Sequence, residues 1–374
     1  MFKKISQKVI GCRVKAAREA KDWTQTQLTK ALELNDRQSV SDIENGKRAL
    51  KPDELIRLTE ILERDIEFFL DPFSVIGEGQ FSWRASKELS EQSLDSFELK
   101  AGQWIGLFRW LRQSEEGRNM DPLKYSLRLT AQSAFEDVIS CAENLVETLE
   151  LGMIPAERLI EKVENDLDIP ILFVDTIETS PGHSISGATC HLQDLSVVLV
   201  NRNETEARRF YNVAHELFHV LTWDAMKPEH RESNSCEERI RGKRIEQLAD
   251  NFAVALLMPK SSLKQLIDHR HISDIGHLTE VAAQLRVTPV SLAWRLYNMK
   301  WISNDVLLAL KRERQRPSSS NILKCFSSTF IKMLYRAIEC GRLSARKAAK
   351  AMGMNLTQLA DLFAEHSFPA PFEL

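Results

Sequence analysis

The pentapeptide His215-Glu216-Leu217-Phe218-His219 constrains this chain more than any other feature of its sequence. Apolar residues recur around it every three to four positions, with no Gly or Pro between them, which predicts an amphipathic helix. Residues four apart share one face of a helix, so His215 and His219 can bind one divalent ion, with Glu216 beside a polarised water. Two histidines on an ordinary amphipathic helix are the alternative.

A catalytic zinc ion needs a third protein ligand besides the two histidines, and one open position for water. Glu246 follows His219 by 27 residues and opens the run EQLADNFAVALLMP, which predicts an apolar helix stopped by Pro259. A carboxylate on the rim of a buried helix must be paired or bound to a metal. The sequence therefore predicts a Zn²⁺ site made by His215, His219 and Glu246, the gluzincin arrangement. In an active site of this kind, Glu216 acts as general base.

Other polar residues near the motif are rivals or helpers. Glu237 and Glu238 lie in a charge run that we expect to be solvated. Asp250, one turn after Glu246, is better suited to accept a hydrogen bond from the N–H of a ligand imidazole. Three residues are unranked candidates for stabilising an oxyanion: Tyr211, His183 and His230.

Three strand-like runs, rich in β-branched residues or alternating in polarity, precede the histidine motif. They cover Ile171–Asp175, Ser186–Leu192 and Ser196–Asn201, and the turn Gln193-Asp194 predicts that the last two form a hairpin. A small antiparallel sheet against the motif helix is the architecture of zincin peptidases. We expect a mostly helical α+β fold.

The N-terminal segment differs from the rest in charge and pattern. Residues 1–50 contain 11 Lys and Arg against 6 Asp and Glu, although the whole chain has a net charge of −3. Thr24 and Gln27 have the spacing of a helix capping box, and Asn35 and Gln38 repeat it before a predicted helix over Arg37–Glu44. Two short capped helices joined by a tight turn predict a helix-turn-helix. We expect it to lie within a five-helix domain. A helical bundle used for protein contact is the alternative.

In a helix-turn-helix, the second helix presents its N-terminal side chains to base edges of double-stranded DNA. Gln38 suits adenine, and Arg37 can reach guanine or phosphate. Ser39 and Ser41 can donate to either. The candidates for phosphate contacts are Thr24, Gln25, Lys47 and Arg48. Repressors that contain a helix-turn-helix bind two half-sites of an operator. We therefore expect a homodimer on an operator.

Both regions resemble known families. Residues 9–72 resemble the Cro/C1-type (XRE) helix-turn-helix family through the runs TQTQL and RQSVSDIENGKR. Residues 150–300 resemble the ImmA/IrrE family of zinc peptidases through RRFYNVAHELFHVL and EQLADNFAVALLMP, preceded by ISGAT and VVLVNRNE. That resemblance implies a bacterial or phage regulatory protease, one that cleaves an XRE-type repressor encoded beside it. Here the two modules share one chain.

A length of 374 residues with 43% apolar and 28% charged residues suggests more than one soluble domain. We expect a helix-turn-helix domain over 1–75, a helical connector over 76–150, the peptidase-like domain over 151–300 and a helical C-terminal region over 301–374. Linkers are expected at 117–122 and 317–320. A helix-turn-helix-like pair within 341–364 is expected to serve packing or oligomerisation.

Six cysteines without a Cys-x-x-Cys pair predict a reducing, cytoplasmic environment, and no apolar run is long enough to predict a membrane span.

Three functions fit these features. The first is a DNA-binding transcriptional regulator with a zinc peptidase domain that cleaves a regulatory protein, or itself, in response to stress or mobile-element signals. The second is an antitoxin-like autorepressor of a toxin–antitoxin or phage-defence operon, with a toxin partner and a sensory or residual zinc site. The third is a peptidase whose helix-turn-helix only recruits a protein substrate.

Overall fold

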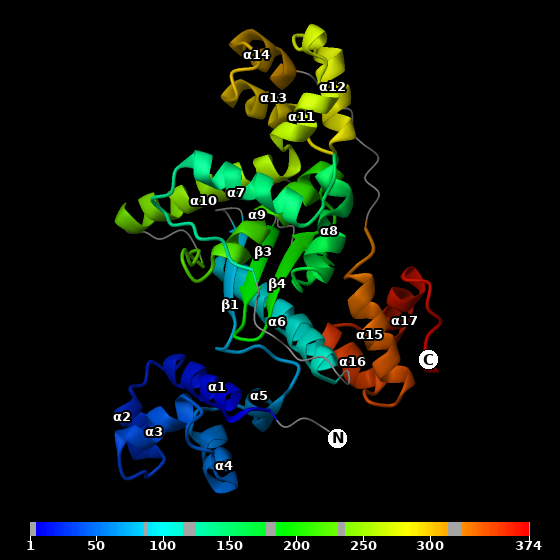
Figure 1. Ribbon diagram of the computed structural model, residues 1–374. Helices are drawn as coiled ribbons and strands as arrows, with labels where there is room; N and C mark the ends of the chain where they lie inside the picture. The colour runs from blue at the N-terminus through cyan, green and yellow to red at the C-terminus, as the bar shows by residue number, and fades with distance from the viewer. Residues whose placement is uncertain are drawn as a thin grey trace. The chain divides into compact units, whose positions relative to one another are not determined.

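The computed structural model describes residues 5–85, 89–114, 125–176, 185–230, 236–312 and 323–373, without the side chains of 236–241. The linkers expected at 117–122 and 317–320 lie outside the described residues. Seventeen α-helices and four strands are present in the described ranges (Figure 1), which confirms the mostly helical α+β fold. None of these helices combines the length and apolarity that crossing a membrane requires.

The chain divides into two compact units, which are described separately. Unit 1 comprises residues 1–80, 90–120 and 328–374, and unit 2 comprises residues 81–89 and 121–327. The four segments expected from the sequence do not map one to one onto these units, and their boundaries stay predictions.

Unit 1 begins with five helices, as the sequence predicted. They are α1 (Gln7–Glu19), α2 (Gln25–Ala31), α3 (Arg37–Glu44), α4 (Pro52–Ile61) and α5 (Ile66–Leu70). Their apolar faces close a core that includes Val14, Leu28, Val40, Leu58 and Phe69. Ile66 stays 48% exposed because α5 buries Phe69 on its other side.

The helix ends explain why α2 and α3 form a helix-turn-helix. The predicted capping box at α2 is present, with Thr24 and Gln27 each accepting a hydrogen bond from the other's backbone N–H. At α3 the prediction is wrong by one residue. Asp36, not Asn35, precedes the first helical residue, and its carboxylate accepts from the backbone N–H of Ser39 at 2.7 Å. After α3, Gly46 takes the left-handed conformation (φ +71°) that ends the helix.

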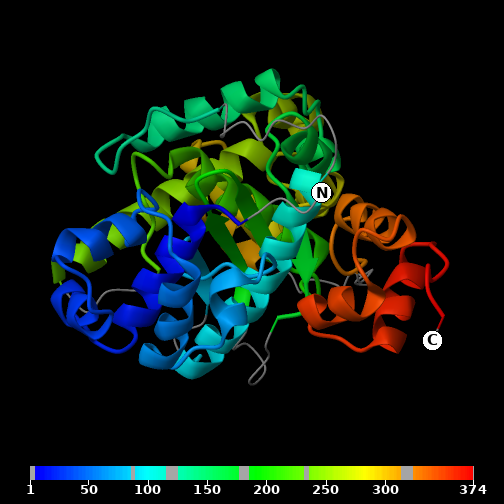
Figure 2. The same ribbon diagram turned by 90° about the horizontal axis from the view of Figure 1, so that it is seen from below.

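The rest of unit 1 is a long helix, drawn in cyan in Figure 1, and a group of three helices. The three helices are drawn in orange to red in Figures 1 and 2. The long helix is α6 (Glu91–Ser114), and the group of three comprises α15 (Ser328–Glu339), α16 (Ala345–Met352) and α17 (Leu356–Glu365). Phe97, Trp104 and Phe108 of α6 are buried in the core. The Trp104 indole N–H donates to the Met352 carbonyl at 3.1 Å, and Phe108 packs edge-on against Phe330. Gly353, left-handed at φ +69°, separates α16 from α17.

A four-stranded sheet organises unit 2. Its strands are β1 (Gln80–Ala85), β2 (Ile171–Val174), β3 (Ile185–His191) and β4 (Ser196–Asn201), in the spatial order β1-β3-β4-β2. The predicted hairpin is present, since β3 and β4 pair antiparallel. The sheet is nevertheless mixed, not purely antiparallel as expected, because β2 pairs with β4 in parallel. The two strands of a hairpin run in opposite directions, so docking through β4 instead of β3 reverses the pairing with β2.

The motif helix α9 (Glu206–Thr222) packs against β3 and β4, and α10 (Cys236–Leu257) packs against α9. Residues 212–222 of α9 are all buried, because the sheet covers one side and α10 another. The remaining helices of unit 2 are α7 (Phe135–Thr148), α8 (Pro155–Asn165), α11 (Lys260–Leu266), α12 (Ile275–Gln284), α13 (Pro289–Asn298) and α14 (Asn304–Arg312), with a 3₁₀ turn at His269–His271.

Candidate metal centre and nucleic-acid interface

The predicted ligand residues meet where α10 packs on α9. His215 and His219 lie on one face of α9, with their Nε2 atoms 3.2 Å apart. Glu246 reaches them from α10, its Oε2 lying 3.1 Å from His215 Nε2 and its Oε1 3.4 Å from His219 Nε2. One ligand atom from each residue lies within 4.8 Å of the others, and in the described residues no other His, Cys, Asp or Glu group converges in this way.

This donor set fits zinc. Two imidazole nitrogens and one carboxylate are the three protein ligands of a zinc site that keeps one position open. Both imidazoles are buried, whereas the Glu246 side chain is half exposed, so the site has an open side. Zinc therefore suits the arrangement on ligand chemistry and convergence together.

Asp250 orients one of the two histidines. Its Oδ1 lies 3.0 Å from His215 Nδ1 and accepts a hydrogen bond from the Tyr211 hydroxyl at 2.5 Å. With a proton on Nδ1, the lone pair of His215 Nε2 points toward His219 and Glu246. The buried Nδ1 of His219 has no such hydrogen-bond partner in the described ranges. The orientation of the ligand set therefore depends most on the His215–Asp250 contact.

The electrostatics of the site favour ionised carboxylates. Burial alone raises the pKa of Glu246, but hydrogen bonds from His215 and His219 outweigh this and hold it well below the usual range. Burial also raises the pKa of Asp250, yet the contacts with His215 and Tyr211 lower it below its ordinary value. Burial lowers the pKa of His215, whereas Asp250 and Glu246 raise it above its ordinary value. A proton and a metal ion therefore compete for His215.

Glu216 faces the sheet, where β3 holds it. Its side chain is buried, and its Oε2 accepts a hydrogen bond from the Thr189 hydroxyl at 2.9 Å. Gly187, two residues earlier on β3, leaves room for it: a Cβ at this position would approach Glu216 Oε1 to 3.2 Å. Both residues belong to the ISGAT run, which carried the family resemblance but gave no reason to assign them a role.

The unranked oxyanion candidates have different surroundings. The Tyr211 hydroxyl is engaged by Asp250, and His230 is exposed. His183, and the side chains of Glu237 and Glu238, lie outside the described residues. Residues 81–84 read as a short extended piece in the sequence, but nothing assigned a role to Arg84, which reaches Asp250 from β1 (Nη2 to Oδ1, 3.8 Å). A lone arginine so far upstream of the motif carries no local pattern.

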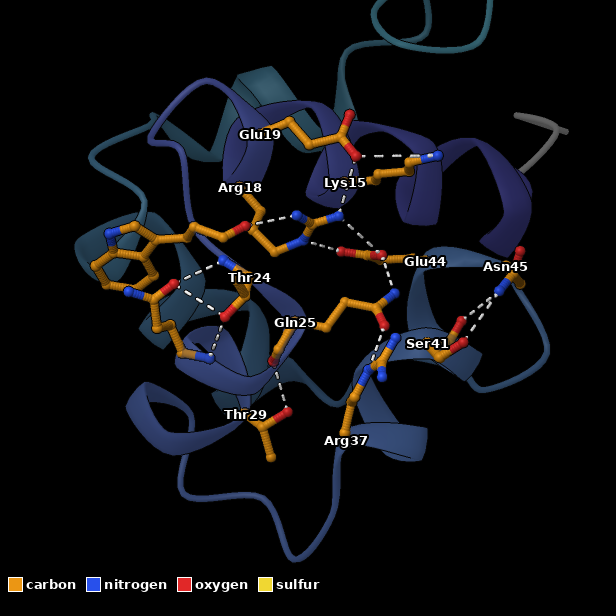
Figure 3. A network of polar contacts seen from close by, with 12 residues as sticks. Lys15, Arg18, Glu19, Thr24, Gln25, Thr29, Arg37, Ser41, Glu44 and Asn45 are labelled. Carbon is orange, nitrogen blue, oxygen red and sulfur yellow. Dashed lines mark hydrogen bonds and ion pairs between the residues drawn. The ribbon is translucent and has the colours of Figure 1, made fainter.

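In the helix-turn-helix, two of the predicted DNA-contacting residues, Gln25 and Arg37, belong to one network of polar contacts (Figure 3). Arg18 and Glu44 form a buried ion pair at 2.6 Å. The Gln25 amide donates to Glu44 at 2.8 Å and accepts from the Arg37 guanidinium at 2.9 Å. Through Arg37 and Glu44, this chain of contacts fixes the first turn of α2 against both ends of α3. The two elements that would approach DNA are thereby held in register.

The other candidates for DNA contact differ in how much of the side chain is free. Arg48 pairs with Glu54 at 2.5 Å, and Ser39 contributes to the cap of α3 through Asp36. Gln38 is exposed and donates to Asp42 at 2.8 Å, one turn along α3. Thr24 serves the α2 capping box, and Ser41 accepts from Asn45. Lys47 is exposed, and its side chain forms no hydrogen bond or ion pair with the described residues.

Comparison with known proteins agrees with both regions. Residues 14–69 match the family model described as helix-turn-helix, and residues 174–297 match the IrrE N-terminal-like domain. The chain therefore contains an XRE-type helix-turn-helix and an ImmA/IrrE-type domain, which confirms the two resemblances and supports a DNA-binding regulator as its broad class.

Among solved structures, the chain is similar to a Mycobacterium tuberculosis transcriptional regulator, at 18% identity and a TM-score of 0.32. The match covers 50% of this chain and 49% of that one, so the chain spans about half the length of this relative. None of the curated proteins matches the chain.

Proposed function

We propose that this DNA-binding regulator recognises an operator through α3 and carries a zinc-dependent peptidase centre in its IrrE-like domain. The observation that carries the proposal is the convergence of ligand atoms of His215, His219 and Glu246 within 4.8 Å. The two histidines lie on α9, which also carries Glu216, and Glu246 lies on the neighbouring α10. The expected substrate is a regulatory protein or this chain itself, cleaved in response to stress or mobile-element signals. The protein would act on its operator as a homodimer.

The chain's own residues divide the work of peptide hydrolysis. His215, His219 and Glu246 would hold the zinc ion, which supplies Lewis acidity when bound. The Glu216 carboxylate takes a proton from the attacking water and delivers it to the leaving amine. The Thr189 hydroxyl holds Glu216 Oε2, and Asp250 holds His215 in the tautomer that a ligand requires.

The test compares wild-type full-length protein with Glu216→Gln and His215→Ala. Zinc content is measured by metal analysis, and cleavage is followed on the protein itself and on a repressor or toxin encoded beside it. We expect Glu216→Gln to keep about one zinc per chain and to lose all cleavage, because a base is removed and no ligand. His215→Ala should lose both zinc and cleavage.

Glu206→Gln is the matched control, because Glu206 is a carboxylate on the same helix that pairs with the exposed Arg286 at 3.1 Å. It should behave as wild type. Equal cleavage by Glu216→Gln and wild type would remove Glu216 from the mechanism. Zinc binding without cleavage of any of these substrates would replace the peptidase with the alternative, an antitoxin-like autorepressor with a sensory zinc site.

A further inference from the structure

Arg84 approaches the metal centre from a part of the chain outside the IrrE-like match, which covers residues 174–297. It lies on β1, an edge strand of the unit 2 sheet. Its guanidinium lies over the Tyr211 ring, 5.2 Å from the ring centroid. Its Nη2 is 3.8 Å from Asp250 Oδ1, and its Nη1 is 3.5 Å from Asn212 Oδ1. Arg84 thus contacts Asp250 and Tyr211, the two residues beside the His215 imidazole.

Three groups meet at one oxygen atom. Asp250 Oδ1 contacts His215 Nδ1, the Tyr211 hydroxyl and Arg84 Nη2. Two of these contacts are hydrogen bonds, and the contact with Arg84 is an ion pair. A carboxylate held by two donors and a nearby cation keeps its rotamer more firmly than one held by a single donor, because each contact restricts it. Asp250 is about half exposed, so solvent would otherwise compete for it. Arg84 therefore restrains the group that orients His215.

The charges of the site lead to the same residue. Glu216, Glu246 and Asp250 carry three negative charges, and a zinc ion between neutral imidazoles carries two positive ones. Arg84 supplies the remaining positive charge. The other cation at the Tyr211 ring, Arg208, is 5.8 Å from its centroid and is neutralised by Glu204 at 3.6 Å. Arg84 is thus the arginine whose charge is directed to Asp250.

We infer that Arg84 is a positioning residue of the metal centre, acting through Asp250 on the orientation of His215. This inference rests on the proposed zinc site. It also means that the centre is not complete within residues 174–297. The strand that supplies Arg84 begins at Gln80, where unit 1 ends, so the segment leading from the helix-turn-helix domain contributes to the zinc site.

The experiment measures zinc affinity of the full-length protein by competition with a chromogenic chelator. We expect Arg84→Ala to bind zinc about tenfold more weakly, within the range seen when outer partners of a ligand are lost. The direction of the change in zinc affinity separates an effect of charge from an effect of orientation. Removing a positive charge would by itself strengthen the binding of a cation, so weakening reports lost orientation. Arg84→Lys should restore most of the affinity, and the matched control Arg208→Ala should match wild type.

A second background tests whether Arg84 acts through Asp250. In Asp250→Asn, adding Arg84→Ala should cause no further loss, because the carboxylate that Arg84 restrains is already gone. An equal loss in both backgrounds, or wild-type affinity in Arg84→Ala, would overturn the inference. If Arg84→Ala does not fold, as judged by circular dichroism, Arg84→Gln answers the same question. Zinc retained by His215→Ala would instead overturn the proposed zinc site itself.

Discussion

The candidate metal centre and the helix-turn-helix use polar residues in opposite ways. At the metal centre, side chains from α9 and α10 bring their ligand atoms to one point, and Asp250 supports them from outside. On the helix-turn-helix, side chains of similar chemistry bind each other, as Gln25 does between Glu44 and Arg37. A convergent cluster directs its ligand atoms at a shared position, whereas an interlocked one builds a rigid platform. The comparison shows that residue type alone does not separate a binding group from a supporting one.

Removing a ligand is the largest expected effect and tests the convergent side of this comparison. Glu246→Ala should abolish stoichiometric zinc binding in the purified protein, because it removes one of the three ligands. Metal analysis gives the result directly. The matched comparison is Asp250→Ala, which removes a supporting carboxylate from the same helix and should weaken zinc binding roughly 10–100-fold instead of abolishing it. Full zinc retention in Glu246→Ala would place the third ligand elsewhere.

The network of contacts in the helix-turn-helix can be tested at the buried ion pair of Arg18 and Glu44. Glu44→Ala leaves the Arg18 guanidinium buried without its main partner, a loss that typically costs about 3–5 kcal/mol. We expect the unfolding transition of the helix-turn-helix domain to shift accordingly in chemical denaturation. Glu19→Ala is the control, since Glu19 also pairs with Arg18 but is 54% exposed. If the two variants are equally stable, the pair does not hold α1 against α3.

Base recognition is the next largest effect. Gln38→Ala should lose about 1–3 kcal/mol of binding free energy at the operator, with relaxed sequence preference. Lys47→Ala should weaken binding to all DNA alike and lower the salt slope by about 1. Gel-shift titrations on the fragment upstream of the gene, with random DNA alongside, measure both. Equal affinity of wild type for the two DNAs would make the module a protein-contact domain.

The smallest expected effect is a pH dependence within the helix-turn-helix. Burial raises the pKa of Glu54, but the hydrogen bonds from the Arg48 side chain and the Lys51 backbone N–H, together with the positive charges of both residues, lower it by more, so the pKa is lowered. A lowered folded-state pKa contributes stability above the unfolded value, about 4.3, and this contribution is lost as pH falls through the folded value. Denaturation midpoints measured from neutral to acid pH should therefore fall less steeply in Arg48→Ala. An unchanged slope would leave Arg48 free for phosphate.

Sequence patterns predicted most of the local structure because helices and caps depend on neighbours a few residues apart. The α2 capping box and the extent of α3 agree with the structure. The cap of α3 was misplaced by one residue, since Asn35 and Asp36 are both good caps and only the helix start separates them. The sheet was misjudged for a different reason: no pattern in a hairpin says which of its strands will dock on a third.

The sequence by itself determined the two domain types and the spacing that places His215 and His219 on one face of a helix. That information is local, because helical periodicity alone puts both imidazoles on the same side. Tertiary structure brought the predicted Glu246 beside them, and it decided what surrounds Glu216 and that Arg84 contacts Asp250. Those contacts join residues far apart in the chain. They exist only because α10 packs on α9 and β1 lies at the edge of the sheet, and no short-range pattern encodes such packing.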